Sequence, residues 1–529
     1  MARRLTKFSK LLITIAIVAA ITFGAKWAMD NTALGDQVEQ LQQDDSANNT
    51  STTNKSPRKT GGSNSDDVIK IGVVTWGGYA GGQYFNEGFE ANTNSRFYKD
   101  YGFKVEFVIL DDFVASRAAW KNDEVDLLWA TIDAFPTESS ALAKFDPVVV
   151  FQADWSRGGD AVVVSRGITK VSDLRGKSIA VGELSPSHSF FLWLLKAGDL
   201  TTEDVNVNFV GNAIDAAAAF KSKSVDAAVV WSPDDEDCVN SVSGARVLES
   251  TRSASHIIAD VFIAKKAYVE NNEAKLQQLY EGWMIGAAEI NRDDANKRKA
   301  AKILADAFEG FDETLSYNAI NNVRLCTHGD NLNFFGLNPN YKNITGERLY
   351  TTMTNVYKDE GVIKSGTRVP NWRLIRYSGL VENANNKFAG NVNQRAEGQR
   401  EFAPSTSADE KKDAIATKAV SINFRSGEFA LDPNAKNIID REFVDIAQSF
   451  SNSKIRVEGN TDNTGNYSSN VKLSKKRAQS VVDYLISEYG MPRNRFIIVG
   501  NGPDNPVASN NTENGRAKNR RTDFELVPD

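Results

Sequence analysis

Aromatic and hydroxyl side chains at the ends of apolar runs are the residues of this sequence that could bind a ligand. Trp76, Trp129 and Trp231 each end an apolar run, and Trp155 follows another. Indole rings can wall a pocket and attract an organic cation through the negative face of the ring. The same rings can belong to a hydrophobic core, so both roles stay open.

A helix start near Phe190 is the second candidate. Ser185 and Ser187 precede it and could seat an anion beside free backbone N–H groups, or could simply cap the helix. His188 could contact a ligand or pack against its neighbours.

Metal and nucleophile chemistry find little support. The three histidines, His188, His256 and His328, are scattered and show no metal-ligand spacing. Cys238 and Cys326 are the two cysteines, too few for a disulfide scaffold or a cysteine-rich metal site. We therefore expect neither an enzyme nor a bound metal or cofactor, and leave open whether the two cysteines pair.

Size and charge narrow the class further. At roughly 100–200 residues per domain, the 529 residues suggest about three domains. The net charge is −6, whereas a protein that neutralises phosphates is normally basic, so we expect no nucleic-acid partner.

The N-terminus carries a membrane signal. Arg3, Arg4, Lys7 and Lys10 precede an apolar run over residues 11–25. Residues 11–29 come close to the length of about 20 residues that spans a bilayer. The sequence after the apolar run lacks well-placed small residues for signal-peptide cleavage. We favour a retained single-pass anchor in the bacterial inner membrane over a cleaved signal. Both alternatives export the rest of the chain to the periplasm.

Two polar segments divide the remainder. Residues 31–66 have too few apolar side chains to fold and are predicted to be a flexible linker. Residues 383–417 are predicted to be a second, partly helical linker. The expected organisation is a cytoplasmic stub with a transmembrane signal-anchor (1–30), a linker (31–66), a two-lobed domain (67–382), a linker (383–417) and a C-terminal domain (418–529).

Between the linkers, short apolar runs alternate with helical patterns. This predicts an α/β fold with largely parallel sheets, and its length predicts two lobes. The predicted strands are residues 68–76, 105–110, 125–130, 147–151, 161–165, 178–182 and 225–231.

The C-terminal region has an α+β pattern of the form βαβαβ-β, opened by alternating apolar residues at 420–424. It contains GNTDNTG at 459–465, LSKKRA at 473–478 and GRAKNRR at 515–521. In order and spacing these motifs resemble the OmpA-like peptidoglycan-binding domain, over residues 420–527.

This resemblance implies a site for the diaminopimelate residue of the peptidoglycan stem, which carries an ammonium and a carboxylate. By position Asp462 supplies the anion, and Arg477 supplies a guanidinium that suits a carboxylate. Asn460 stands where many members have His, and it flanks the aspartate without replacing it. The other residues expected around the site are Thr461, Asn463 and Leu473 in the cleft, and Asn519 and Arg521 at its rim.

The central segments DLRGKSIAV (173–181), FKSKSVDAAVVW (220–231) and NDEVDLL (122–128) resemble periplasmic substrate-binding proteins of the nitrate/sulfonate/taurine ABC-transporter type. The resemblance implies a type II two-lobed fold that closes over a ligand at strand ends. The expected solute-binding residues are Trp76, Tyr79, Trp129, Thr131, Trp155, Ser156, Ser187, His188 and Trp231. The charge of the solute stays open.

These features together predict an envelope protein that binds peptidoglycan and a small solute and works with an ABC permease or another inner-membrane complex. The alternative is a membrane-to-wall tether or stator-like element whose central domain is ligand-gated or degenerate. A polar cleft would favour the first reading, and a cleft filled by core side chains the second.

Overall fold

The computed structural model describes residues 68–422, 424, 425 and 427–528. The predicted anchor and the first linker, residues 1–66, lie outside the described residues. Within the described residues no helix is both long enough and apolar enough to cross a membrane.

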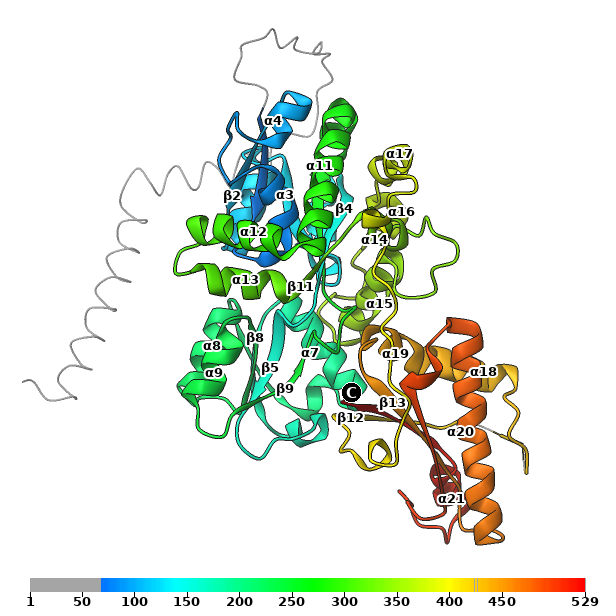
Figure 1. The fold of residues 1–529 in the computed structure, drawn as a ribbon. Helices are drawn as coiled ribbons and strands as arrows, with labels where there is room; N and C mark the ends of the chain where they lie inside the picture. Colours follow the sequence, from blue (N-terminus) through cyan, green and yellow to red (C-terminus); the bar gives the residue numbers. More distant parts are fainter. Residues whose placement is uncertain (1–67, 423, 426, 529) are drawn as a thin grey trace, which may run out of the picture. The chain divides into compact units, whose positions relative to one another are not determined.

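The first lobe of the central region is built on a six-stranded sheet (Figure 1). β1 is parallel to β2 and β3, whereas β10 is antiparallel to β3 and β4. The strand order is β11 (Val323–Leu325), β4 (Pro147–Ser156), β10 (Ala259–Lys265), β3 (Leu127–Thr131), β1 (Val68–Val73) and β2 (Lys104–Ile109).

The second lobe is built on a five-stranded sheet in which β6 is parallel to β7 and β8, and β5 is antiparallel to β8 and β9. The order is β7 (Asn206–Val210), β6 (Ser178–Gly182), β8 (Ala227–Trp231), β5 (Asp160–Val164) and β9 (Arg246–Ser250). The chain crosses between the sheets from β4 to β5 and again from β9 to β10, which makes the region two-lobed as predicted.

Helices cover the sheets because strands such as β3 and β5 are buried at every position. Figure 1 shows α3 and α11 beside the first sheet, and α8 and α9 beside the second. The helices of the first lobe and of the segment after it are α3 (Ala80–Phe85), α4 (Arg96–Tyr101), α5 (Phe113–Lys121), α6 (Pro136–Leu142), α10 (Lys266–Asn271), α11 (Glu273–Arg292), α12 (Asp294–Ala307), α13 (Glu313–Asn321), α14 (His328–Phe334), α15 (Gly346–Asp359), α16 (Trp372–Ile375) and α17 (Gly379–Phe388). Those of the second lobe are α7 (Pro186–Ala197), α8 (Ala213–Lys221) and α9 (Asp234–Ser241).

The prediction of largely parallel sheets was wrong for about half of the pairings. All seven predicted strands exist, β6 with the predicted bounds and the other six with shifted ends, but β7, β9, β10 and β11 were not foreseen. The crossing strands β4 and β10 lie side by side in one sheet and run in opposite directions, which forces antiparallel pairing.

The C-terminal domain is a four-stranded sheet in the order β12 (Ala416–Val420), β15 (Thr522–Val527), β13 (Lys454–Asn460) and β14 (Phe496–Gly502). Its helices are α18 (Pro433–Ile439), continued by a π-helical segment (Asp440–Val444), α19 (Asp445–Ser449), α20 (Tyr467–Tyr489) and α21 (Glu513–Asn519). The predicted βαβαβ-β order is present, with two differences: the first strand ends at Val420, and α21 forms over the third motif.

The second linker is more ordered than its polarity predicts. α17 extends into it to Phe388, and Gln394 is buried against the first lobe. The Gln394 amide donates to the Met284 carbonyl at 2.8 Å and accepts from the His328 N–H at 2.9 Å. Gln394 thus satisfies buried backbone groups, while most other polar side chains of this segment are exposed. Both cysteines are buried and unpaired, Cys238 in α9 and Cys326 after β11.

Candidate functional site

A small cavity lies where the two lobes meet. Its volume is about 20 Å³, and its walls come from the ends of β1, β3 and β8, the starts of β5, β10 and α7, and the 3-10 turn Gly77–Tyr79. It is lined by Val74, Trp76, Tyr79, Trp129, Thr131, Asp160, Pro186, Trp231, Ile258 and Asp260. Five of the nine predicted solute-binding residues are therefore brought together: Trp76, Tyr79, Trp129, Thr131 and Trp231.

The other four predicted residues lie elsewhere. Trp155 is buried against His256, with ring centroids 4.9 Å apart, on the opposite side of β4 from its neighbour Asp154. The Ser156 hydroxyl donates to Asp160 at 2.7 Å and so reaches the cavity only through that carboxylate.

At the start of α7 neither predicted serine caps the helix with its side chain, and the anion-binding alternative stays a prediction. The Ser185 hydroxyl donates to the Gly182 carbonyl at 2.7 Å, and no side chain caps the helix. Ser187 is buried with its hydroxyl unpartnered among the described residues. His188 packs against Phe209 and Tyr357, and burial lowers the pKa of its imidazole to about 4, so it is neutral.

Buried carboxylates are the residues that the sequence reasoning missed. Asp160 and Asp260 line the cavity, while Asp154 and Asp133 lie behind them, and all four are at most 4% exposed. Asp154 and Asp260 are direct partners across β4 and β10. Asp154 precedes Trp155 on β4, and because side chains alternate along a strand the two face opposite sides of the sheet.

Hydrogen bonds tie these carboxylates to the aromatic walls. Trp76 Nε1 donates to Asp154 at 3.2 Å, and the Tyr79 hydroxyl donates to Asp260 at 2.8 Å. A Cβ at Gly78 would lie 1.6 Å from the Asp154 carboxylate, so only glycine lets Trp76 and Asp154 approach there.

Burial controls the electrostatics of the group. It raises the pKa of Asp154 to about 8 and that of Asp160 and Asp133 to about 7, because a desolvated carboxylate loses its hydration. Burial raises the pKa of Asp260 well above its usual range, and the nearby Asp154 charge raises it further.

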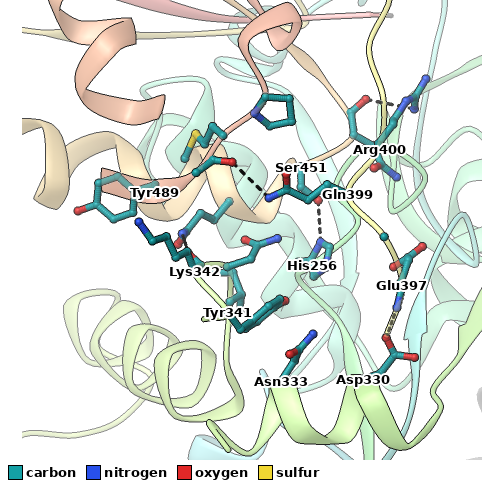
Figure 2. A pocket seen from close by; sticks show the side chains of 18 of the residues that line it. His256, Asp330, Asn333, Tyr341, Lys342, Glu397, Gln399, Arg400, Ser451 and Tyr489 are labelled. Carbon is teal, nitrogen blue, oxygen red and sulfur yellow. Dashed lines mark hydrogen bonds between the residues drawn. The ribbon is translucent and has the colours of Figure 1, made fainter. Parts of the chain in front are cut away.

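A larger pocket of about 480 Å³ lies where the central region, residues 397–402 and the C-terminal domain meet (Figure 2). Its His256 Nδ1 is 2.7 Å from the Ser451 hydroxyl, and the Glu397 N–H donates to Asp330 at 2.7 Å. Of the predicted site residues it contains only Trp155. Its polar groups mainly join segments of the chain to one another.

The predicted wall-binding pair is positioned by β13 and α20. Arg477 lies on the buried stripe of α20 with Ser474, Ala478 and Val481, at helical spacing. A Cβ at Gly459 would lie 2.1 Å from the Ser474 carbonyl oxygen, so glycine permits the close packing of strand and helix.

Asp462 and Arg477 differ in their partners. Asp462 accepts from Arg520 at 2.6 Å and from the Thr464 N–H at 2.8 Å, and these bonds hold the pKa of its carboxyl below the usual range despite partial burial. Arg477 donates to the Glu428 carbonyl at 3.0 Å and covers the Phe424 ring at 4.8 Å. In the described part of the chain Arg477 forms no ion pair.

The remaining predicted residues divide into two groups. Thr461 is buried beside Asp462, Asn463 is exposed and Leu473 is half-buried. Asn519 binds the loop at Val507 and Ala508, and Arg521 is paired with Asp523 at 2.7 Å, so both predicted rim residues have partners within the domain. Arg520, between them, is the residue that reaches Asp462, and the sequence reasoning did not assign it.

Comparison with known families divides the chain in the same way. Residues 423–520 match the OmpA family. Residues 92–288 match the family described as ABC transporter, phosphonate, periplasmic substrate-binding protein.

Curated relatives match over the C-terminal region. Outer membrane protein A of Bordetella avium is 36% identical over 126 residues, which is 23% of this chain and 64% of that protein. The probable lipoprotein YiaD of Escherichia coli is 35% identical over 20% of this chain and 48% of its own. The peptidoglycan-binding protein ArfA of Mycobacterium tuberculosis is 38% identical over 20% of this chain and 31% of its own. The chain thus spans between about a third and two thirds of these relatives.

Solved structures match over the central region. The periplasmic aliphatic sulphonate binding protein SsuA of E. coli covers 60% of this chain and 100% of its own at 18% identity, with a TM-score of 0.47. The nitrate-binding protein NrtA of Synechocystis covers 64% of this chain and 92% of its own at 12% identity, also with 0.47. Similarity at this level does not bear on the ligand.

Proposed function

Because residues 423–520 are an OmpA family domain and residues 92–288 match a substrate-binding family of ABC transporters, we propose that this chain is a cell-envelope binding protein. Its C-terminal domain holds peptidoglycan, and its central domain holds a small solute between two lobes. The protein is not an enzyme in this proposal.

The observation that carries the wall-binding half is the cluster of Asp462, Arg520 and Arg477. Asp462 is paired with Arg520 at 2.6 Å, whereas Arg477 donates to the Glu428 carbonyl. Burial lowers the pKa of Arg477, the Arg520 charge lowers it further and the Asp462 charge opposes this shift. A ligand carboxylate can bind Arg477, which has no carboxylate partner among the described residues, while a ligand ammonium shares Asp462 with the half-exposed Arg520.

This charge arrangement fits the free end of a diaminopimelate stem residue, which carries both groups on one carbon. Lysine, the alternative stem residue, ends in an ammonium alone and leaves the guanidinium unmatched. We therefore expect binding to diaminopimelate-type walls and weak binding to lysine-type walls.

Sedimentation with purified sacculi tests this half of the proposal. Asp462→Asn keeps the shape and the Thr464 bond but removes the charge, and a charged hydrogen bond of about 1.5–3 kcal/mol predicts at least about tenfold weaker binding. Glu513→Gln is the matched control, since Glu513 also pairs with Arg520 but does not contact Asp462 directly. Equal sedimentation of Asp462→Asn and the wild type would refute the assigned site.

The buried carboxylates favour a solute receptor over the tether with a degenerate domain. A cleft that had lost its ligand would be expected to fill with apolar side chains, since unpaired buried charges destabilise a fold. The cavity instead keeps Asp160 and Asp260.

The location completes the proposal. The basic and apolar residues at the N-terminus support a retained inner-membrane anchor with the bulk of the chain in the periplasm. Such an anchor would place the receptor beside an ABC permease or another inner-membrane complex. Fractionation of cells with and without residues 1–30 measures this directly, because loss of the segment should release the chain from the membrane fraction.

A further inference from the structure

We propose that the solute held between the lobes is a small protonated amine, bound by the carboxylates of Asp160 and Asp260 within a cage of tryptophan rings. This proposal rests on the proposed function of the cleft as a solute site. It goes beyond it by fixing the charge and the hydrogen-bonding character of the ligand.

The cavity wall carries two carboxyl groups and no basic residue. Its two charged residues are Asp160 and Asp260, and each has one oxygen engaged by a neighbour, Ser156 and Tyr79 respectively. Behind them Asp154 Oδ1 is buried and has no hydrogen-bond partner among the described residues. Buried carboxylate oxygens with acceptor capacity left over are suited to a ligand that brings N–H groups.

The nearby cations are already neutralised. Arg117 makes two hydrogen bonds of 2.8 Å to Glu138, and Arg157 is paired with Glu397 at 2.6 Å. None of the four buried aspartates forms an ion pair within the part of the chain that the structure describes. The cleft therefore lacks the one cation that would let these carboxylates ionise.

Indole rings surround the same space. Trp76, Trp129 and Trp231 line the cavity, and the Arg117 guanidinium already lies 4.6 Å from the Trp129 ring centroid. Phe113 adds an edge contact to Trp129 at 5.2 Å. Rings arranged in this way stabilise a positive charge placed among them.

Two unused donors add a second feature of the ligand. Trp129, 2% exposed, lines the cavity, and its Nε1 has no hydrogen-bond partner among the described residues; the same holds for Trp231 Nε1. An oxygen on the ligand, such as a hydroxyl or an amide carbonyl, would satisfy one of them. This second feature favours an amine that also carries a neutral oxygen.

Size separates a primary amine from a quaternary ammonium. A cavity of about 20 Å³ accepts a group of roughly the size of a water molecule. A –NH₃⁺ group fits this description and donates to the carboxylates, whereas –N(CH₃)₃⁺ is larger and has no donor. The rest of a ligand enters by separation of the lobes, since β4–β5 and β9–β10 are the segments that cross between them.

An anion would meet the opposite environment. A phosphonate or sulfonate placed here would face carboxylates and would have no lysine or arginine on the cavity wall. The family description of residues 92–288 names phosphonate, so the ligand inferred from the residues differs in charge from that of the family name.

Proton linkage supports the same ligand. Burial raises the pKa of Asp160 to about 7, and Asp235 on α9 raises it further; Asp154 on β4 rises to about 8. Asp133 and Asp260, on the other neighbouring elements, are raised as well, and Arg157 only partly opposes the effect at Asp154. A bound ammonium favours the ionised form, so binding releases protons and strengthens as the pH rises from 6 to 8.

Calorimetry on the full-length chain tests the proposal, with ethanolamine, ethylamine, tetramethylammonium, methylphosphonate, methanesulfonate and nitrate as probes. We expect saturable binding of the two amines and no binding of the anions. Binding of an amine near pH 7 should release protons to the buffer. Asp160→Asn and Asp260→Asn should each weaken amine binding at least tenfold. Asp306→Asn, an exposed aspartate on α12, is the matched control and should bind as the wild type does.

The outcomes separate this proposal from the proposed function. Binding of an anion, abolished by a cleft variant, would overturn the amine ligand and leave the solute receptor standing. Tighter binding of tetramethylammonium than of either amine would overturn the hydrogen-bonding argument. If the chain unfolds cooperatively and no probe binds, the amine ligand is overturned. If a metabolite extract then also fails to shift the unfolding transition, the result counts against the receptor itself.

Discussion

Replacing Asp160 by asparagine should change how the stability of the central domain depends on pH. Burial raises the pKa of Asp160 from its usual value of 3.8 to about 7, so the folded state holds a proton that the unfolded state has lost. The stability from this protonated carboxyl is fully present below about pH 4 and is lost as the pH rises through 7. Three pKa steps at about 1.4 kcal/mol each make the loss roughly 4 kcal/mol by pH 8.

The Asp160→Asn substitution removes this loss without a change of shape. The amide oxygen of the new side chain can still accept from the Ser156 hydroxyl, which donates to Asp160 in the wild type. The variant should therefore be more stable than the wild type at pH 8 and should lose less stability between pH 5 and pH 8. Asp154 and Asp133 keep the remaining pH dependence, since burial raises their pKa values too.

Urea unfolding monitored by tryptophan fluorescence reports on the central domain. The chain has nine tryptophans, and none lies in residues 418–529, so the signal does not report the C-terminal domain. Asp306→Asn, in an exposed i,i+4 pair, should follow the wild type at every pH. Parallel pH curves for Asp160→Asn and the wild type would show that Asp160 ionises freely and would remove the electrostatic basis of the cleft argument.

Two further predictions concern packing and the thiols. Gly459→Ala places a Cβ 2.1 Å from a backbone carbonyl of α20, so it should destabilise the C-terminal domain by about 1–3 kcal/mol or more, seen as faster amide exchange in β13 while tryptophan-monitored unfolding is unchanged. Cys238 and Cys326 should react with maleimide only after unfolding, because both are buried and burial raises the pKa of the Cys238 thiol to about 11. Mass spectrometry counts the labels. If the unfolded chain takes up no label until a reductant is added, the two cysteines form a disulfide and the prediction is wrong.

The cleft was predictable where a residue ends a strand. Trp76 follows β1 and Trp129 lies near the end of β3, and the ends of these neighbouring parallel strands meet at one edge of the first sheet. Trp231 ends β8 of the second sheet and meets them where the lobes face each other. The carboxylates were not predictable in the same way. Asp260 lies on β10, a strand that the apolar pattern did not reveal, and it pairs with Asp154 across a sheet register that only the fold sets.

In the C-terminal site, the motif does not tell which of two adjacent arginines faces Asp462. Motif position selected Asp462 and Arg477, whose role in binding stays a prediction; Asp462 follows β13, and Arg477 lies on the buried stripe of α20. It assigned Arg521 to the rim, whereas Arg521 turns inward to Asp523 and Arg520 turns outward to Asp462. Adjacent residues at a helix end point in different directions, and a motif alone does not say which one faces the ligand.

The contacts between the domains bear on whether solute binding and wall binding are independent. Residues 251–258 cross between the lobes from β9 to β10, and the C-terminal domain contacts this segment. The His256 N–H donates to the Ser449 carbonyl at 3.0 Å, and the Asn452 side chain donates to the Arg252 carbonyl at 3.0 Å. Under the proposed function, a lobe rotation about this crossing that breaks these bonds would couple the two binding events. A solute that favours the rotated arrangement would then change the free energy of wall attachment by the same amount that wall attachment changes the affinity for the solute.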